Sequence, residues 1–117
     1  MHELSLCQNL IDQLTTLTRQ HQAVGVARVE LRVGQLSGVE PSLLETAFDL
    51  ARPGTVAALA DLVTDIIPPR IVCPDCGMTA TVEANDLRCP TCGGSETELV
   101  GGHELILARV ELLQTGG

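Results

Sequence analysis

The chain has 117 residues, and 44% of them are hydrophobic. This composition suits either one domain with a modest core or a small core plus a subdomain that a metal ion stabilises. Its formal charge of -8 argues against a nucleic-acid partner, because phosphate backbones are bound by clustered Lys and Arg. The N-terminus lacks a basic leader and no apolar run reaches membrane-spanning length. We therefore expect a cytoplasmic protein whose cysteines stay reduced.

The first segment has apolar residues at helical spacing, which predicts an amphipathic helix over residues 4–20. Its apolar stripe consists of Leu4, Cys7, Ile11, Leu14 and Thr18. Because Cys7 falls on this stripe, we interpret it as a buried packing residue and not as a ligand or nucleophile. His21 follows the helix, where a solvated imidazole is the ordinary interpretation.

The next segments predict a strand and a second helix. Residues 26–36 alternate, with Val29, Leu31 and Val33 on one face, as in a half-buried strand. Residues 37–54 place Pro41 where a helix can start and Pro53-Gly54 where it can stop. Between them, apolar residues recur at helical spacing: Leu44, Ala47, Phe48 and Ala51.

Two further segments are typical of strands. Residues 59–67 are rich in β-branched side chains and end at Pro68-Pro69. Residues 103–113 alternate again, which predicts one buried face that carries Ile106, Ala108, Val110 and Leu112. The sequence outside the cysteine region therefore predicts three strands and two helices.

Two cysteine pairs carry the strongest chemical signal. Cys73 and Cys76 are separated by two residues, as are Cys89 and Cys92, and twelve residues lie between the pairs. Such spacing lets each pair occupy two corners of a tetrahedron, and four thiolates suit a closed, structural Zn²⁺ site. The alternatives are two disulfides, which a reducing compartment disfavours, and a mononuclear iron site with four thiolates, which spacing alone does not distinguish.

The segment between the pairs, residues 79–88, predicts a polar hairpin too small to fold alone. Metal binding would then supply the folding free energy of this subdomain. His103 could approach the cysteines, although exposure at a strand end is the better interpretation. No Ser-His-Asp order, phosphate loop or supported carboxylate pair is found in the sequence, so we expect no enzymatic activity.

The sequence starts with MHE, which offers a nitrogen-rich set of metal donors. The α-amino group of Met1, the backbone amides and the imidazole of His2 lie within a few bonds of one another. Such a set suits Ni²⁺ or Cu²⁺ better than Zn²⁺, and the Glu3 carboxylate could orient it. The plain alternative is a polar chain end with an acidic residue in the first helical turn.

Taken together, these motifs resemble the HypA/HybF family of hydrogenase-maturation nickel metallochaperones. The resemblance rests on MHELSLCQNL, VELRVGQLSGVEP, AFDLARPGT, both CxxC pairs and GHELILARVEL, in the expected order over nearly the whole chain. It implies an α+β fold with a small three-stranded antiparallel sheet and two helices, interrupted by a four-cysteine zinc-ribbon subdomain. The implied nickel-binding domain covers residues 1–70 plus 101–117, and the zinc ribbon covers residues 71–100. The chain departs from the family in ARPGTVAALADLVTDIIPP, where an acidic residue is more often found after GT.

The resemblance also implies a function and its residues. Nickel would be held by His2 with its neighbours Met1 and Glu3 as transient cargo, and structural zinc by the four cysteines. The implied partners are a HypB-like GTPase of the nickel-insertion pathway and a hydrogenase large subunit. One alternative is a zinc-ribbon protein-interaction adaptor with no nickel role, and another is a thiol oxidoreductase. The sequence leaves open whether the chain forms a homodimer.

Overall fold

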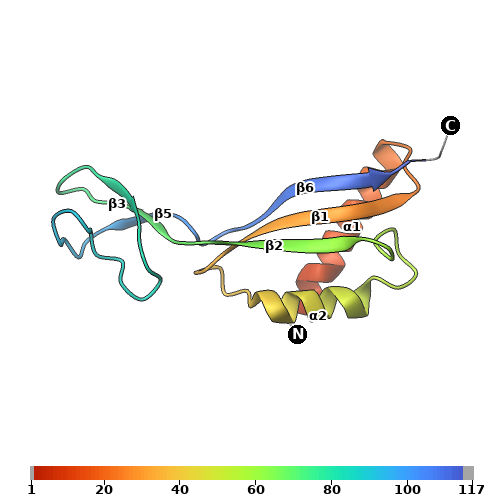
Figure 1. Cartoon of the computed structure of the whole chain (residues 1–117), viewed down its shortest axis with the longest axis horizontal. Coiled ribbons are helices and arrows are strands. Elements are labelled where there is room, and N and C mark those ends of the chain that lie inside the picture. Colours follow the sequence, from red (N-terminus) through yellow and green to blue (C-terminus); the bar gives the residue numbers. More distant parts are fainter. Residues whose placement is uncertain (1, 115–117) are drawn as a thin grey trace. The chain divides into compact units, whose positions relative to one another are not determined.

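The computed structural model describes residues 2–114 and forms two compact units (Figure 1). The first, here called the helical unit, comprises the residues up to 31, residues 40–64 and those from 107 onward. The second, here called the cysteine unit, comprises residues 32–39 and 65–106.

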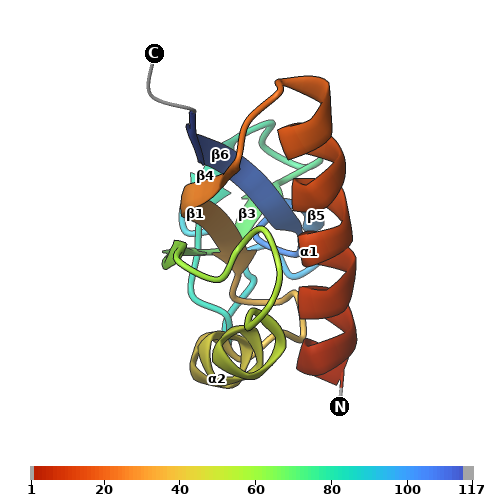
Figure 2. The same cartoon turned by 90° about the vertical axis from the view of Figure 1, so that its right-hand side faces the viewer.

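Two helices provide most of the core of the helical unit. Helix α1 spans His2–Gln20, so it starts two residues earlier than predicted. Helix α2 spans Pro41–Ala51 and ends before Pro53, as predicted. Phe48, the single aromatic residue, is fully buried, and Leu14 and Leu44 are the next largest fully buried side chains. Figures 1 and 2 show both helices on the same face of the sheet.

The sheet that the helices cover has the order β2-β1-β6, with β1 at Gly25–Gly34, β2 at Asp61–Ile67 and β6 at Leu105–Leu113. The predicted inward face of β1 is confirmed, since Val29, Leu31 and Val33 are buried. Gly34 at the end of β1 donates to the carbonyl of Glu104, just before β6, so these strands are antiparallel. The next N–H, of Gln35, donates to the carbonyl at the end of β2, so β1 and β2 run in the same direction.

Strand β6 differs from its predicted pattern. Ala108 and Arg109 are consecutive exposed residues, which interrupts the alternation of inward and outward side chains. Ile106 and Ala108 are consequently exposed, while Val110 and Leu112 are half-buried. The prediction of one buried face along this strand was wrong, because a run of consecutive apolar residues does not determine which of them faces the core.

The cysteine unit contains a second sheet, which the sequence pattern did not predict. Its strands are β3 at Arg70–Val72, β4 at Thr79–Thr81 and β5 at Glu98–Gly101, and β3 pairs antiparallel with both neighbours. Ile71 at its centre is fully buried. The predicted α+β class, with two helices, a small three-stranded sheet and an inserted four-cysteine unit, is confirmed. The sheet was predicted to be antiparallel; β6 and the second sheet are, while β2 runs parallel to β1.

Candidate metal centre

Each cysteine pair lies in a tight turn, and the two turns have the same backbone hydrogen bonds. The N–H of Cys73 donates to the carbonyl of Met78 at 2.9 Å, and the N–H of Gly77 donates back to Cys73 at 2.7 Å. In the second turn Cys89 donates to Gly94 at 2.9 Å, and Gly93 donates back to Cys89 at 2.8 Å. Gly77 and Gly93 both have φ of 75°, a left-handed conformation that costs glycine little.

The two turns bring the four predicted zinc ligands together. The Sγ atoms of Cys73, Cys76, Cys89 and Cys92 all lie within 4.8 Å of one another. Across the turns, Sγ of Cys73 is 3.6 Å from Sγ of Cys92, and Sγ of Cys76 is 3.5 Å from Sγ of Cys89. Four thiolates about 2.3 Å from a tetrahedral Zn²⁺ would lie about 3.8 Å apart, so the donor set fits this ion.

The two thiols of each turn differ in exposure, and those of the second turn also differ in pKa. Cys73 and Cys89 are buried, whereas Cys76 and Cys92 are exposed. The backbone N–H of Cys92, helped by that of Thr91, lowers the pKa of Cys89 to about 6 and so stabilises its thiolate. The N–H of Gly94 favours the Cys92 thiolate, but hydrogen bonds shared with Cys73 and Cys89 outweigh it and raise the pKa of Cys92 to about 12. Four thiolates can therefore lie this close together only if a cation takes the place of the protons that the sulfurs share in these hydrogen bonds.

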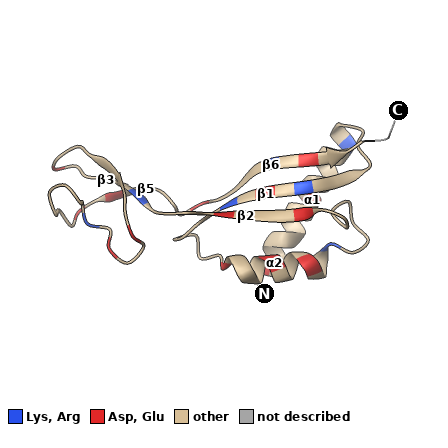
Figure 3. Ribbon diagram, viewed as in Figure 1, with Lys and Arg blue, Asp and Glu red and all other residues tan. Residues whose placement is uncertain are grey.

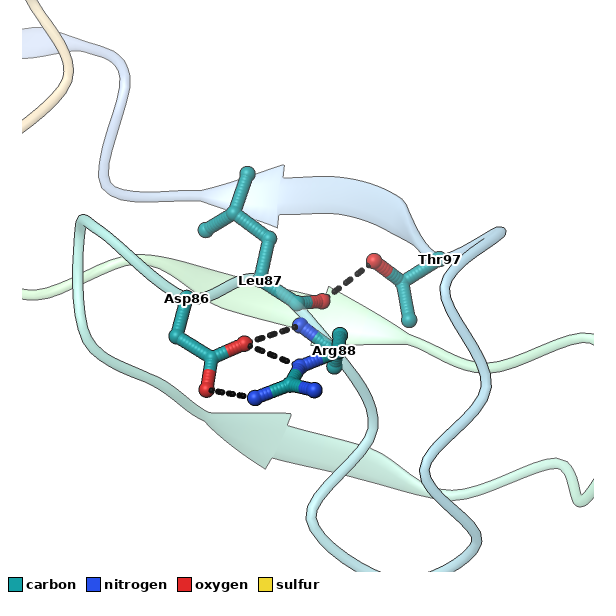
Figure 4. Close-up of polar contacts among 4 residues, drawn as sticks. All are labelled: Asp86, Leu87, Arg88 and Thr97. Atoms are coloured by element: carbon teal, nitrogen blue, oxygen red, sulfur yellow. Dashed lines mark hydrogen bonds and ion pairs between the residues drawn. The ribbon is translucent and has the colours of Figure 1, made fainter.

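A group of polar contacts braces the chain just before the second turn (Figure 4). The carboxylate of Asp86 accepts from Nε of Arg88 at 2.8 Å and from Nη2 at 2.9 Å. Oγ1 of Thr97 donates to the carbonyl of Leu87 at 2.6 Å, which ties the segment before Cys89 to the segment after Cys92. These residues were not singled out in the sequence, because a DLR triplet and a distant threonine form no known ligand spacing.

The other sequence candidates are not part of this four-cysteine cluster. His103 is exposed, and the potential metal cluster found among residues 2–114 contains only the four cysteines. Cys7 is fully buried, and its thiol donates to the carbonyl of Leu44 at 3.5 Å, in keeping with a packing role. His2 is the first residue of α1, and Glu3 is half-buried in its first turn. Met1 and the side chain of His2 lie outside the described part of the chain.

Charge and hydropathy add two observations. Acidic side chains outnumber basic ones, 15 to 7, and Figure 3 shows acidic residues on both units. Within residues 2–114, no helix combines the length and the apolar character needed to cross a membrane.

Comparison with known proteins places this arrangement in a family. A family model described as "Hydrogenase/urease nickel incorporation, metallochaperone, hypA" matches residues 1–112. The chain is 39% identical to the hydrogenase maturation factor HypA of Aquifex aeolicus, over 96% of this chain and 97% of that protein. It is 43% identical to HypA of Nitrosospira multiformis, over 98% of this chain and all of that protein (100%).

Solved structures agree with this assignment. The solution structure of the Ni metallochaperone HypA from Helicobacter pylori superposes with a TM-score of 0.71 at 26% identity, covering 97% of this chain and 98% of that one. A second HypA solution structure gives a TM-score of 0.77 at 26% identity, with 98% of both chains covered. With its four gathered cysteines and its match from residue 1 to residue 112, the chain belongs to the HypA family of nickel metallochaperones for hydrogenase maturation.

Proposed function

We propose that this protein binds Ni²⁺ at its N-terminus, delivers it to a hydrogenase large subunit and catalyses no reaction itself. The observation that carries the proposal is the match to a nickel-incorporation family that includes residues 1–3, where the sequence reads MHE. The family description also mentions urease, but the relatives compared above are named hydrogenase maturation factors. Hydrogenase is therefore the proposed destination.

The proposed nickel donors are the α-amino group of Met1, the amide and imidazole of His2, and the amide of Glu3. Helix α1 begins at His2, and the first four N–H groups of a helix have no acceptor within it. The amides of His2 and Glu3 can therefore be deprotonated and bind a metal without breaking helical hydrogen bonds. The positive end of the helix dipole opposes a bound cation, which suits a carrier that must release its cargo.

The four cysteines are proposed to hold Zn²⁺ as a structural cofactor. All four positions of a tetrahedral ion would be filled by Cys73, Cys76, Cys89 and Cys92, which leaves no position for a substrate. We propose the zinc ribbon, residues 71–100, as a domain separate from the nickel-binding domain of residues 1–70 plus 101–117.

The test is nickel calorimetry on four forms of the untagged protein: wild type, His2→Ala, His21→Ala and a form acetylated at its terminal amine. All seven basic residues are arginines, so amine-selective acetylation modifies the α-amino group alone. We expect His2→Ala and acetylation each to abolish Ni²⁺ binding, because each removes a nitrogen donor. The matched control His21→Ala removes an exposed histidine after the end of α1 and should bind Ni²⁺ like the wild type.

Zinc content, measured by elemental analysis, should stay the same in all four forms. Equal nickel affinity in all of them would contradict the nickel site. The zinc-ribbon adaptor would then be the better function, since an adaptor needs zinc only.

We also propose that the GTPase of the pathway docks on the helical unit. The outer face of α1 carries exposed Gln8, Asp12 and Gln13, close in sequence to the proposed nickel donors. Docking there would place the donor nitrogens near the acceptor, and the acidic balance of the chain would make association depend on salt.

A further inference from the structure

The cysteine unit contains an open hollow away from the four thiols, with a volume of about 280 Å³. It is bordered by β1, β2, β3 and β5 and by the first residues of β6. The side chains that matter here are Arg32, Arg70, Glu104, Ile67, Val100 and Ile106. None of them has a part in the zinc or nickel sites proposed above.

The backbone positions Arg70 in this hollow. The pairing of β3 with β5 shifts register between Arg70 and Ile71, and such an irregularity redirects a side chain. Gly101 lies opposite Arg70 in the register, and a Cβ at Gly101 would sit 3.6 Å from Cβ of Arg70 and 3.9 Å from its Cγ and Cδ. The aliphatic stem of Arg70 therefore lies along the backbone at Gly101, and Arg70 lines the hollow together with Arg32.

Both arginines of the hollow are exposed and have no carboxylate within 4.0 Å among the residues described. By contrast, Arg28, Arg52 and Arg88 each form an ion pair with an acidic side chain. Glu104 lines the same hollow and forms no ion pair with either arginine, so the hollow carries two positive charges and one negative charge. In a protein of net charge -8, this hollow thus keeps uncompensated positive charge.

Apolar side chains form the rest of the wall. Val100 is 47% exposed and Ile106 is 41% exposed, and Ile67 beside them is half-buried. Exposed β-branched residues next to unpaired guanidinium groups leave both apolar area and hydrogen-bond donors without a partner. A small inorganic anion would satisfy the donors only.

We propose that this hollow binds an acidic, apolar peptide segment of a partner protein. The planar guanidinium groups of Arg32 and Arg70 match carboxylates in a two-bond geometry, and the flanking apolar residues of the peptide cover Val100 and Ile106. This surface lies in the cysteine unit, so it is distinct from the GTPase surface proposed on α1. It gives that unit a recognition role in addition to metal binding.

The experiment uses the full chain and a fluorescent, capped hexapeptide in which two central glutamates are flanked by leucine and valine. Binding is measured by fluorescence anisotropy for the wild type, Arg32→Gln, Arg70→Gln and the matched control Arg109→Gln. Arg109 is also exposed and forms no ion pair among the described residues, but it lies in the helical unit. We expect each hollow variant to bind about fivefold more weakly or worse, as for a partly exposed charge pair, and Arg109→Gln to bind like the wild type.

Three comparisons can overturn the proposal. A peptide with both glutamates replaced by glutamine should bind more weakly, and equal binding would exclude carboxylate recognition. Inorganic phosphate at the peptide's concentration should not displace it, and displacement would show a simple anion site. An equal loss in Arg109→Gln would show non-specific charge attraction. Unchanged backbone amide spectra in all three variants would show that each loss reflects binding and not misfolding, and nickel calorimetry should be unaffected throughout.

Discussion

At the scale of single residues, the five cysteines divide by environment. Four Sγ atoms are gathered within 4.8 Å, whereas Cys7 is buried in the helical core against Leu44. The spacing of the two pairs predicted this division, and the position of Cys7 on a helical stripe predicted its burial. The unequal exposure within each pair could not be predicted, because it depends on how the turns pack.

Replacing Cys73 with alanine should abolish stoichiometric zinc, because three thiolates cannot complete a closed structural site. The matched control is Cys7→Ala, which removes a thiol of the same kind from a packing position. It should keep one zinc per chain and lose about 1 kcal/mol of unfolding free energy. Elemental analysis measures the first effect and denaturant unfolding the second. Full zinc occupancy in Cys73→Ala would disprove the ligand assignment.

The Asp86 carboxylate should titrate unusually low. Its hydrogen bonds from the Arg88 side chain and backbone lower its pKa to about 2. Because the folded pKa lies below the unfolded value of about 3.9, its stabilising effect is fully present above about pH 4 and is lost as pH falls through the folded value. Carboxylate NMR should detect this titration in the wild type and a return toward the ordinary value in Arg88→Gln. An unchanged Asp86 pKa in that variant would mean that the ion pair seen in Figure 4 is not maintained in solution.

At the scale of elements, the helices were predictable and the small strands were not. Both helices follow from apolar spacing, together with Pro41 at the start of α2 and Pro53 after its end. Strands β3 and β4 have three residues each, which is too short for an alternating pattern to appear in the sequence. The turn that contains Cys73 and Cys76 connects these two strands, so their pairing follows from a turn and not from an alternating pattern.

The turn glycines should be essential for metal affinity. Gly77→Ala places a Cβ on a backbone with φ of 75°, which costs about 1–2 kcal/mol and distorts the turn that aims Cys73 and Cys76. We expect zinc affinity to fall roughly tenfold in competition with a chromophoric chelator. Gly54→Ala is the matched control, since Gly54 has φ of 76° and an equally open environment but lies in the helical unit. It should lower stability and leave zinc affinity unchanged, so an equal loss in both variants would point to general destabilisation.

At the scale of the whole molecule, the two units differ in the kind of side chain that forms their buried interior. The helical unit has a core of large apolar side chains, led by Phe48, Leu14 and Leu44. In the cysteine unit, the fully buried side chains include Ile71, Pro69 and two of the four clustered cysteines, Cys73 and Cys89. We therefore expect apolar packing to stabilise the helical unit and a metal ion bound by the four cysteines to stabilise the cysteine unit.

Removing zinc with a chelator should unfold the cysteine unit and leave the helices intact. The helical circular dichroism signal, Ni²⁺ binding and GTPase binding should all persist, because α1 and the proposed nickel donors belong to the helical unit. The reciprocal control is Phe48→Ala, which should cost about 3–5 kcal/mol in the helical core while zinc remains bound. Loss of GTPase binding on zinc removal alone would place the docking surface on the cysteine unit and contradict the proposal.

Because each cysteine turn has one buried and one exposed thiol, a competing ligand would reach a metal ion at this site from one side. A competing thiol or chelator can reach Cys76 and Cys92, one in each turn, while Cys73 and Cys89 are shielded by the chain. At a metal ion held by these four cysteines, ligand exchange would begin at the exposed sulfurs, while Cys73 and Cys89 would continue to hold the ion. A zinc ion at this site would thus be retained by slow exchange as well as by affinity, which would limit its exchange with the proposed nickel cargo.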